Sequence, residues 1–141
     1  MSTEKAGLVT SYTMRVETSL SYDEAVGSVR EALAEQGFGV LTEIDVRAVM
    51  KEKLGVDVPA HVILGACRPE LAHRALAAAP SVGALLPCNV VVRDDAGATV
   101  VEAIDPDTMS RLEHRPEIVE VAGEARTRLR AALDHIAQKE A

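Results

Sequence analysis

Apolar and polar residues follow strand-like spacing in some segments of this chain and helix-like spacing in others. Apolar side chains occupy every second position over residues 12–17, which predicts a first strand. The next apolar residues recur every three or four positions up to about Gln36, which predicts an amphipathic helix that Gly37 ends. Ser21 and Glu24 form a capping box at its start, because each side chain can accept a hydrogen bond from a free backbone amide.

Strand and helix patterns alternate again in the middle of the chain. A strand is predicted over residues 38–44, and Asp45 is expected to cap a short helix that Gly55 ends. A further strand is predicted over residues 61–66, followed by a helix over residues 69–79 that has a proline in its first turn. Four apolar side chains of the short helix are expected to face inward: Val46, Val49, Met50 and Leu54.

The last third of the chain predicts a hairpin and a long helix. Residues 90–92 and 99–104 flank the turn-forming sequence Asp94-Asp95-Ala96-Gly97, in which the glycine can adopt a positive φ, so we predict an antiparallel hairpin. Residues 116–139 carry apolar side chains along one helical face and charges along the other.

Together these elements predict an α/β (α+β) fold with a single two-layer domain. We expect one mixed sheet of about five strands, helices packed on it, and a long C-terminal helix. Residues 1–10 are expected to form a flexible N-terminal tail, and residues 11–141 a single α/β domain.

Composition narrows the range of functions. The chain has 141 residues, is 48% hydrophobic and contains one Phe, two Tyr and no Trp. Its net charge of −7 and its scarcity of aromatic residues argue against partners that are nucleic acids or membrane surfaces. The polar N-terminal residues lack the apolar stretch of a secretory signal, so a cytoplasmic location and reduced thiols are expected.

Two cysteines are the main candidates for chemistry. Cys67 ends a predicted strand and precedes Arg68 and Pro69, so a guanidinium and a helix start are both expected to favour its thiolate. A thiolate is both a nucleophile and a metal ligand. Free cysteine also packs as a small apolar residue, and this structural role is favoured over a functional one for both Cys67 and Cys88.

Metal binding has weaker support from the sequence. A zinc site usually draws four ligands from Cys and His, often with two in a short pair, and this chain has no such pair. Cys67 and Cys88 remain the candidate ligands, for zinc or copper, with a histidine that only the fold can bring to them. His61 shares a strand with Cys67 but lies about 20 Å away along it.

Two further side chains are candidates for ligand binding beside Cys67, Arg68 and Cys88. Glu43 lies two positions before Asp45, and paired carboxylates can share a proton or hold a cation. The alternative interpretation makes Asp45 a helix cap and pairs Glu43 with Arg47 or Lys51. Asn89 follows Cys88, and its amide can orient a ligand or secure a loop.

Several ordered segments resemble the bacterial and archaeal family called domain of unknown function 302. The resemblance covers residues 12–112 and implies a compact α/β protein and a homodimer, but no reaction. At Arg68 the sequence departs from the asparagine associated with the family. The segments are Gly37-Phe38-Gly39-Val40-Leu41-Thr42-Glu43-Ile44-Asp45, Ile63-Leu64-Gly65-Ala66-Cys67, Leu71-Ala72-His73-Arg74-Ala75-Leu76 and Leu85-Leu86-Pro87-Cys88-Asn89-Val90-Val91-Val92.

Three functions are compatible with these observations. The first is a module that binds or senses a small molecule or metal around the Cys67 and Cys88 loops. The second is a purely structural or interaction homodimer with both cysteines in its core. The third is a thiol-based redox enzyme that uses Cys67 as nucleophile and Cys88 as resolving thiol. No complete catalytic motif and no cofactor motif occurs in the sequence, so enzymatic activity stays undecided.

Overall fold

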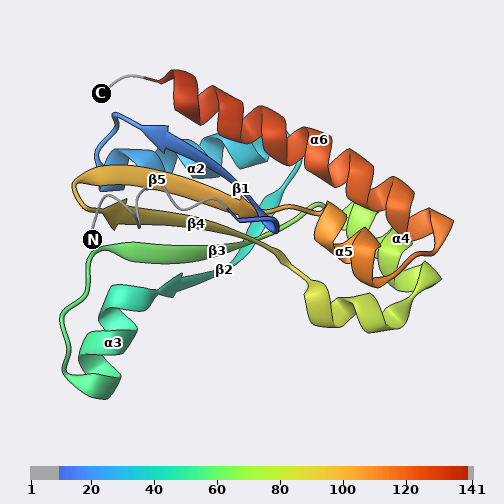
Figure 1. Ribbon diagram of the computed structural model, residues 1–141, viewed down its shortest axis with the longest axis horizontal. Helices are drawn as coiled ribbons and strands as arrows, with labels where there is room; N and C mark the ends of the chain where they lie inside the picture. Colours follow the sequence, from blue (N-terminus) through green and yellow to red (C-terminus); the bar gives the residue numbers. More distant parts are fainter. Residues whose placement is uncertain (1–9, 140–141) are drawn as a thin grey trace.

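An antiparallel sheet organises the chain, and its helices lie on one face of the sheet and beyond both of its ends (Figure 1). The computed structural model describes residues 10–139, so the tail expected over residues 1–10 lies, except for Thr10, outside the described part. The strand order is β1-β5-β4-β3-β2. The strands are β1 (Thr13–Thr18), β2 (Gly39–Asp45), β3 (His61–Cys67), β4 (Cys88–Asp95) and β5 (Ala98–Ile104). The helices are α2 (Tyr22–Glu35), α3 (Val46–Leu54), α4 (Pro69–Ala78), the 3-10 helix η1 (Pro80–Leu85), α5 (Asp107–Leu112) and α6 (Pro116–Gln138).

The predicted fold class is confirmed, with one correction to the sheet. It has five strands, packed helices and a long C-terminal helix, but all of its neighbouring strands are antiparallel rather than mixed. A parallel connection needs a crossover that runs along the sheet. Here α3 connects β2 to β3 beyond one end of the sheet, and α4 with η1 connects β3 to β4 beyond the other end. The chain therefore reverses direction at both of these connections (Figure 1).

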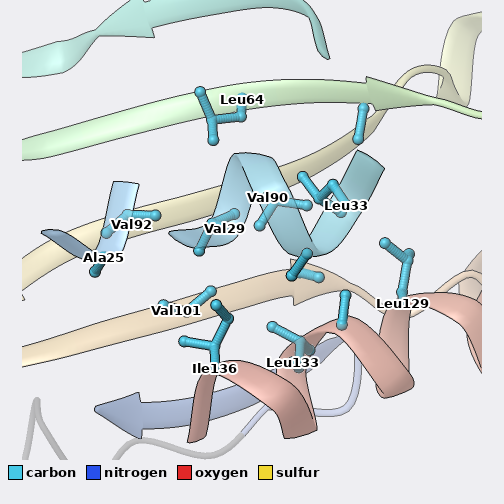
Figure 2. Packing of buried hydrophobic residues seen from close by; sticks show 14 of the residues in the cluster. Ala25, Val29, Leu33, Leu64, Val90, Val92, Val101, Leu129, Leu133 and Ile136 are labelled. Carbon is cyan, nitrogen blue, oxygen red and sulfur yellow. The ribbon is translucent and has the colours of Figure 1, made fainter. Parts of the chain in front are cut away.

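Helices α2 and α6 cover one face of the sheet and form the main core with it (Figure 2). The predicted capping box starts α2: the Ser21 hydroxyl accepts from the Glu24 amide at 3.2 Å, and the Glu24 carboxylate accepts from the Ser21 amide at 2.9 Å. Side chains at helical spacing on both helices meet alternate side chains of the strands. Residues in this contact include Ala25, Val29, Leu33, Leu64, Val90, Val92, Val101, Leu129, Leu133 and Ile136.

The N-terminal half of α6 builds a second core beyond the sheet. Ile118 and Ala122 are fully buried there against α4, η1 and α5. Because α6 continues from this cluster onto the sheet, one helix joins the two cores (Figure 1).

The prediction for α3 is correct in its ends and wrong in its packing. Asp45 caps the helix by accepting from the Ala48 amide at 2.9 Å, and Gly55 ends it with φ of 67°. None of its residues is buried, however, and Val49 and Leu54 are 38% and 68% exposed. Val46 and Met50 are half-buried near the start of β3, and the helix projects from the ends of β2 and β3 (Figure 1).

The predicted hairpin is confirmed between β4 and β5. Asp95 pairs with Ala98, which leaves Ala96 and Gly97 as a two-residue turn with φ values of 55° and 88°. Two positive φ values are typical of the turn type that matches the twist of a hairpin. The strands extend further than predicted, from Cys88 to Ile104 across the turn.

Candidate functional site

A cavity with a volume of about 60 Å³ lies where β3 ends and β4 begins. It occupies the junction between the two cores, because Phe38 and Ala66 line it from the sheet side while Leu71, Met109 and Val121 line it from α4, α5 and α6. Most of its wall is apolar. Four residues with chemically active side chains are among those that line it: Cys67, Cys88, Arg68 and Asp105.

The strand register brings the two cysteines to this cavity. Ala66 is paired with Cys88 of β4, and the next residue, Cys67, ends β3 and is paired with Gly39 of β2. Both cysteines are free thiols and both are partly buried. The structure thus brings together the two cysteines that the sequence singled out.

The expected thiolate at Cys67 is not supported, because the pKa changes in the opposite direction. Burial raises the pKa of the Cys67 thiol above its usual value. Burial is the larger cause that raises the pKa of Cys88 to about 11, and the negative charge that Cys67 carries when it ionises is the smaller cause. These raised pKa values keep both thiols neutral near pH 7. Because a thiol reacts as a nucleophile only when it is ionised, both are weakly reactive at that pH.

Arg68 is the basic side chain of the cavity wall. Its Nη1 donates to the Glu70 carboxylate at 3.0 Å, while its Nε is buried and has no hydrogen-bond partner among residues 10–139. Gly37 lies against the same guanidinium, since a Cβ at this glycine would be 3.1 Å from Nε. Arg68 was predicted to act on Cys67, yet it does not lower the pKa of that thiol.

Asp105 is a cavity residue that was not predicted from the sequence. Its carboxylate accepts hydrogen bonds from Arg126 Nε at 3.2 and 3.3 Å and from the Asp107 amide at 3.0 Å. The negative charge is therefore already compensated. The sequence Asp105-Pro106-Asp107 suggests a pair of acids, but Asp before Pro more often starts a turn or helix, and the partner Arg126 lies far along the chain on α6.

Two predicted binding residues lie away from the cavity. Glu43 is exposed on β2 and forms an ion pair with Arg30 of α2, not with Arg47 or Lys51. Asn89 is exposed and paired with Gly65, one position along β4 from Cys88. Successive residues of a strand face opposite sides, so Asn89 points away from the side that Cys88 occupies.

The described residues hold no cluster suited to a metal ion. No group of three or more His, Cys, Asp or Glu side chains within residues 10–139 is placed to bind one. His61 begins β3 at the opposite end from Cys67, as the strand length predicted. Two thiols alone make an incomplete ligand set for zinc.

The fold and the cavity define a small α+β domain with an apolar pocket at one end of its sheet. The chain belongs to the family described as "Domain of unknown function DUF302", whose model matches residues 12–136. It is also similar to the crystal structure of an uncharacterized conserved protein DUF302 from Bacillus stearothermophilus, with 32% sequence identity and a TM-score of 0.84. That match covers 90% of this chain and 99% of the other.

Two further findings concern possible functions of the chain. No curated protein matches this chain. No helix among residues 10–139 has the length and apolar character needed to cross a membrane. The family resemblance inferred from the sequence is confirmed, and it assigns no reaction to the chain.

Proposed function

We propose that this domain binds a small molecule in the cavity beside Cys67 and Cys88. The observation that carries the proposal is the cavity itself: an apolar volume with a few polar groups in its wall, which is the usual form of a small-molecule site. Its position also supports this function. The cavity lies at the junction of the two cores, where their side chains do not fill the space completely.

The thiols serve as part of the cavity wall in this proposal. Their raised pKa values argue against the redox enzyme considered from the sequence, because that mechanism needs a thiolate at Cys67. As neutral groups, the two side chains contribute small, polarisable surfaces that contact apolar parts of a ligand. Metal binding receives no comparable support from the described residues.

A pair of alanines on α4 provides the test. Ala72 lines the cavity, whereas Ala77 of the same helix is exposed and does not. Titration of the ¹⁵N-labelled protein with hexan-1-ol is expected to shift amide resonances around Cys67 and Met109 in a saturable way. Ala72→Leu fills the cavity and is expected to abolish these shifts, while Ala77→Leu leaves them unchanged. Unsaturable shifts in the wild type, or equal binding by Ala72→Leu, would contradict the proposal.

We also propose that the domain forms a homodimer through the surface made by β2 and α3, here called the β2/α3 surface (residues 39–58). Of the ten large apolar side chains exposed among residues 10–139, five lie on it. They are Leu41, Ile44, Val49, Leu54 and Val56. Exposed apolar side chains concentrated on two successive elements in this way are typical of protein interfaces.

Backbone and charge both favour a second copy of this chain as the partner. Strand β2 is at the edge of the sheet, so one side of its backbone can pair with another strand, and a two-fold axis makes such a contact self-complementary. Residues 39–58 carry three basic and four acidic side chains, in a chain with a net charge of −7. Two copies therefore repel each other less at this surface than their net charge suggests.

Two equally exposed leucines test the dimer. Leu41 on β2 and Leu112 at the end of α5 are both 66% exposed. Leu41→Glu is expected to convert a dimer into a monomer in light scattering coupled to size-exclusion chromatography, because it buries a charge in the apolar interface. Leu112→Glu is expected to remain a dimer. A monomeric wild type, or two variants with the same mass, would contradict this interface.

A further inference from the structure

Arg68 gives the cavity a chemical preference that its apolar wall lacks. The side chain is 16% exposed and forms part of the wall near Cys67, at the start of α4. Its buried Nε has no hydrogen-bond partner among residues 10–139. This donor is enclosed by protein against Gly37, so a ligand in the cavity would bind the terminal nitrogens of the guanidinium, of which Nη1 donates to the exposed Glu70.

The present partner of the guanidinium is one that a ligand can replace. Glu70 pairs with Arg68 at 3.0 Å, and the Glu70 side chain is 68% exposed. An ion pair with such an exposed partner contributes little stability, because water solvates the carboxylate equally well when the pair opens. A carboxylate inside the cavity would meet Arg68 where water is scarce, and there the charged hydrogen bonds are stronger.

The other charges around the cavity agree with an anionic ligand. Asp105 is already bound by Arg126 and by a backbone amide, so it offers little to a cationic ligand. Helix α4 begins at Pro69, and its positive end lies beside Arg68 without a capping side chain. This helix start adds to the attraction that Arg68 exerts on an anion.

The cavity also limits the size of the ligand. A volume of about 60 Å³ accommodates the centres of roughly four to six water molecules, at about 10–15 Å³ for each. We propose that the ligand is a short monocarboxylate, whose apolar part fills the cavity between Cys88 and Met109 and whose carboxylate binds Arg68. This inference rests on the proposed ligand-binding function and adds the chemical class of the ligand.

The experiment compares three six-carbon probes that differ in their polar group: hexanoate, hexan-1-ol and hexylamine. Each is titrated into the ¹⁵N-labelled protein at pH 7. Hexanoate is expected to bind at least about tenfold more tightly than hexan-1-ol, and hexylamine more weakly than either. Equal affinity for hexanoate and hexan-1-ol would overturn the carboxylate preference and leave the cavity proposal intact. Absence of saturable shifts with all three probes would overturn both.

Matched variants locate the source of the preference. Arg68→Gln is expected to reduce hexanoate affinity to that of hexan-1-ol without changing hexan-1-ol binding. Arg74→Gln is the control, since Arg74 lies on the same helix, pairs with Glu120 and does not line the cavity. Glu70→Gln removes the competing carboxylate without altering Arg68, so it is expected to tighten hexanoate binding by severalfold. Unchanged hexanoate affinity in both Arg68→Gln and Glu70→Gln would overturn the assignment to Arg68.

Discussion

The two ends of the sheet are built from similar pieces of sequence but packed in opposite ways. Each end has a strand, a helix of about ten residues and a loop before the next strand. At the α4 end, α5 and α6 cover the helix and enclose a cavity, whereas α3 at the other end has no buried residue (Figure 1). The difference comes from α6, which reaches beyond one end of the sheet and not beyond the other.

This comparison explains why we assign different roles to the two ends. A concave, mostly apolar volume suits a small ligand. An exposed apolar helix beside an edge strand suits a flat protein partner. We expect the following substitutions and pH changes to distinguish the two ends.

The largest effect is expected from truncating a side chain at the closed end. Ile118 of α6 is fully buried in the second core, so Ile118→Ala should lower the free energy of unfolding by about 2–5 kcal/mol. Leu54→Ala in α3 should change it by less than about 0.5 kcal/mol, because Leu54 is 68% exposed. Urea unfolding at a concentration where the chain is monomeric gives both values. Similar losses for the two variants would show that α3 is packed as firmly as α6.

A smaller effect is expected at Gly65, where β3 lies close to β2 and to the segment that precedes β4. A Cβ at Gly65 would meet the Thr42 hydroxyl and lie 2.9 Å from Cγ of Pro87, just before Cys88. Gly65→Ala should therefore destabilise the fold by about 1–3 kcal/mol. Gly123→Ala is the control, because no atom lies within 4 Å of its added Cβ and alanine favours the helix α6 by about 0.5–1 kcal/mol. Thermal unfolding should thus shift in opposite directions, and a harmless Gly65→Ala would contradict the close packing.

The smallest effects are expected from pH, and they differ in sign between the ends. At the closed end the raised pKa of Cys88, about 11 against a usual 9.0, keeps the thiol neutral while the unfolded chain ionises. Stability is therefore lost as pH rises from 9 toward 11, by about 1.4 kcal/mol at pH 10. At the open end, burial and the charge of Arg93 lower the pKa of His61 from its usual 6.5. The folded state therefore favours the neutral imidazole, and the stability that this adds is lost as pH falls below 6.5.

Single variants separate these two contributions. Cys88→Ala should flatten the alkaline decline of stability and His61→Gln the acid decline, each measured by urea unfolding across pH. Labelling of the native protein with a thiol reagent gives an independent reading, since Cys88 should react only slowly below pH 9. Rapid labelling of either cysteine at pH 7 would contradict the raised pKa values and restore the redox mechanism as a candidate.

Much of the fold could be predicted from local pattern. Three short-range signals form the cap or turn that the sequence indicated. They are Ser21 with Glu24, Asp45 with Gly55, and Ala96 with Gly97. Spacing of apolar residues also located the five strands and the helices α2, α3, α4 and α6 to within a few residues, but it did not predict η1 or α5. These features depend on contacts between residues that are near each other in the chain.

The candidate site could be predicted only in part. Cys67 ends β3, Arg68 follows it and Cys88 begins β4, and the structure brings all three to the cavity. Glu43 and Asn89 do not reach it. Their direction depends on which face of the sheet the helices cover, and strand alternation alone leaves that choice open.

The sequence by itself determined the order of elements, their caps and turns, and the position of two thiols at neighbouring strand ends. Only the tertiary structure decided that burial raises the pKa values of the two thiols, that Asp105 joins them, and that α3 stays exposed while α4 is covered. Burial and pKa depend on how much water distant segments remove from a side chain. Here the N-terminal half of α6, which begins at Pro116 although α4 ends at Ala78, excludes the water at one end, and no segment among residues 10–139 does so at the other.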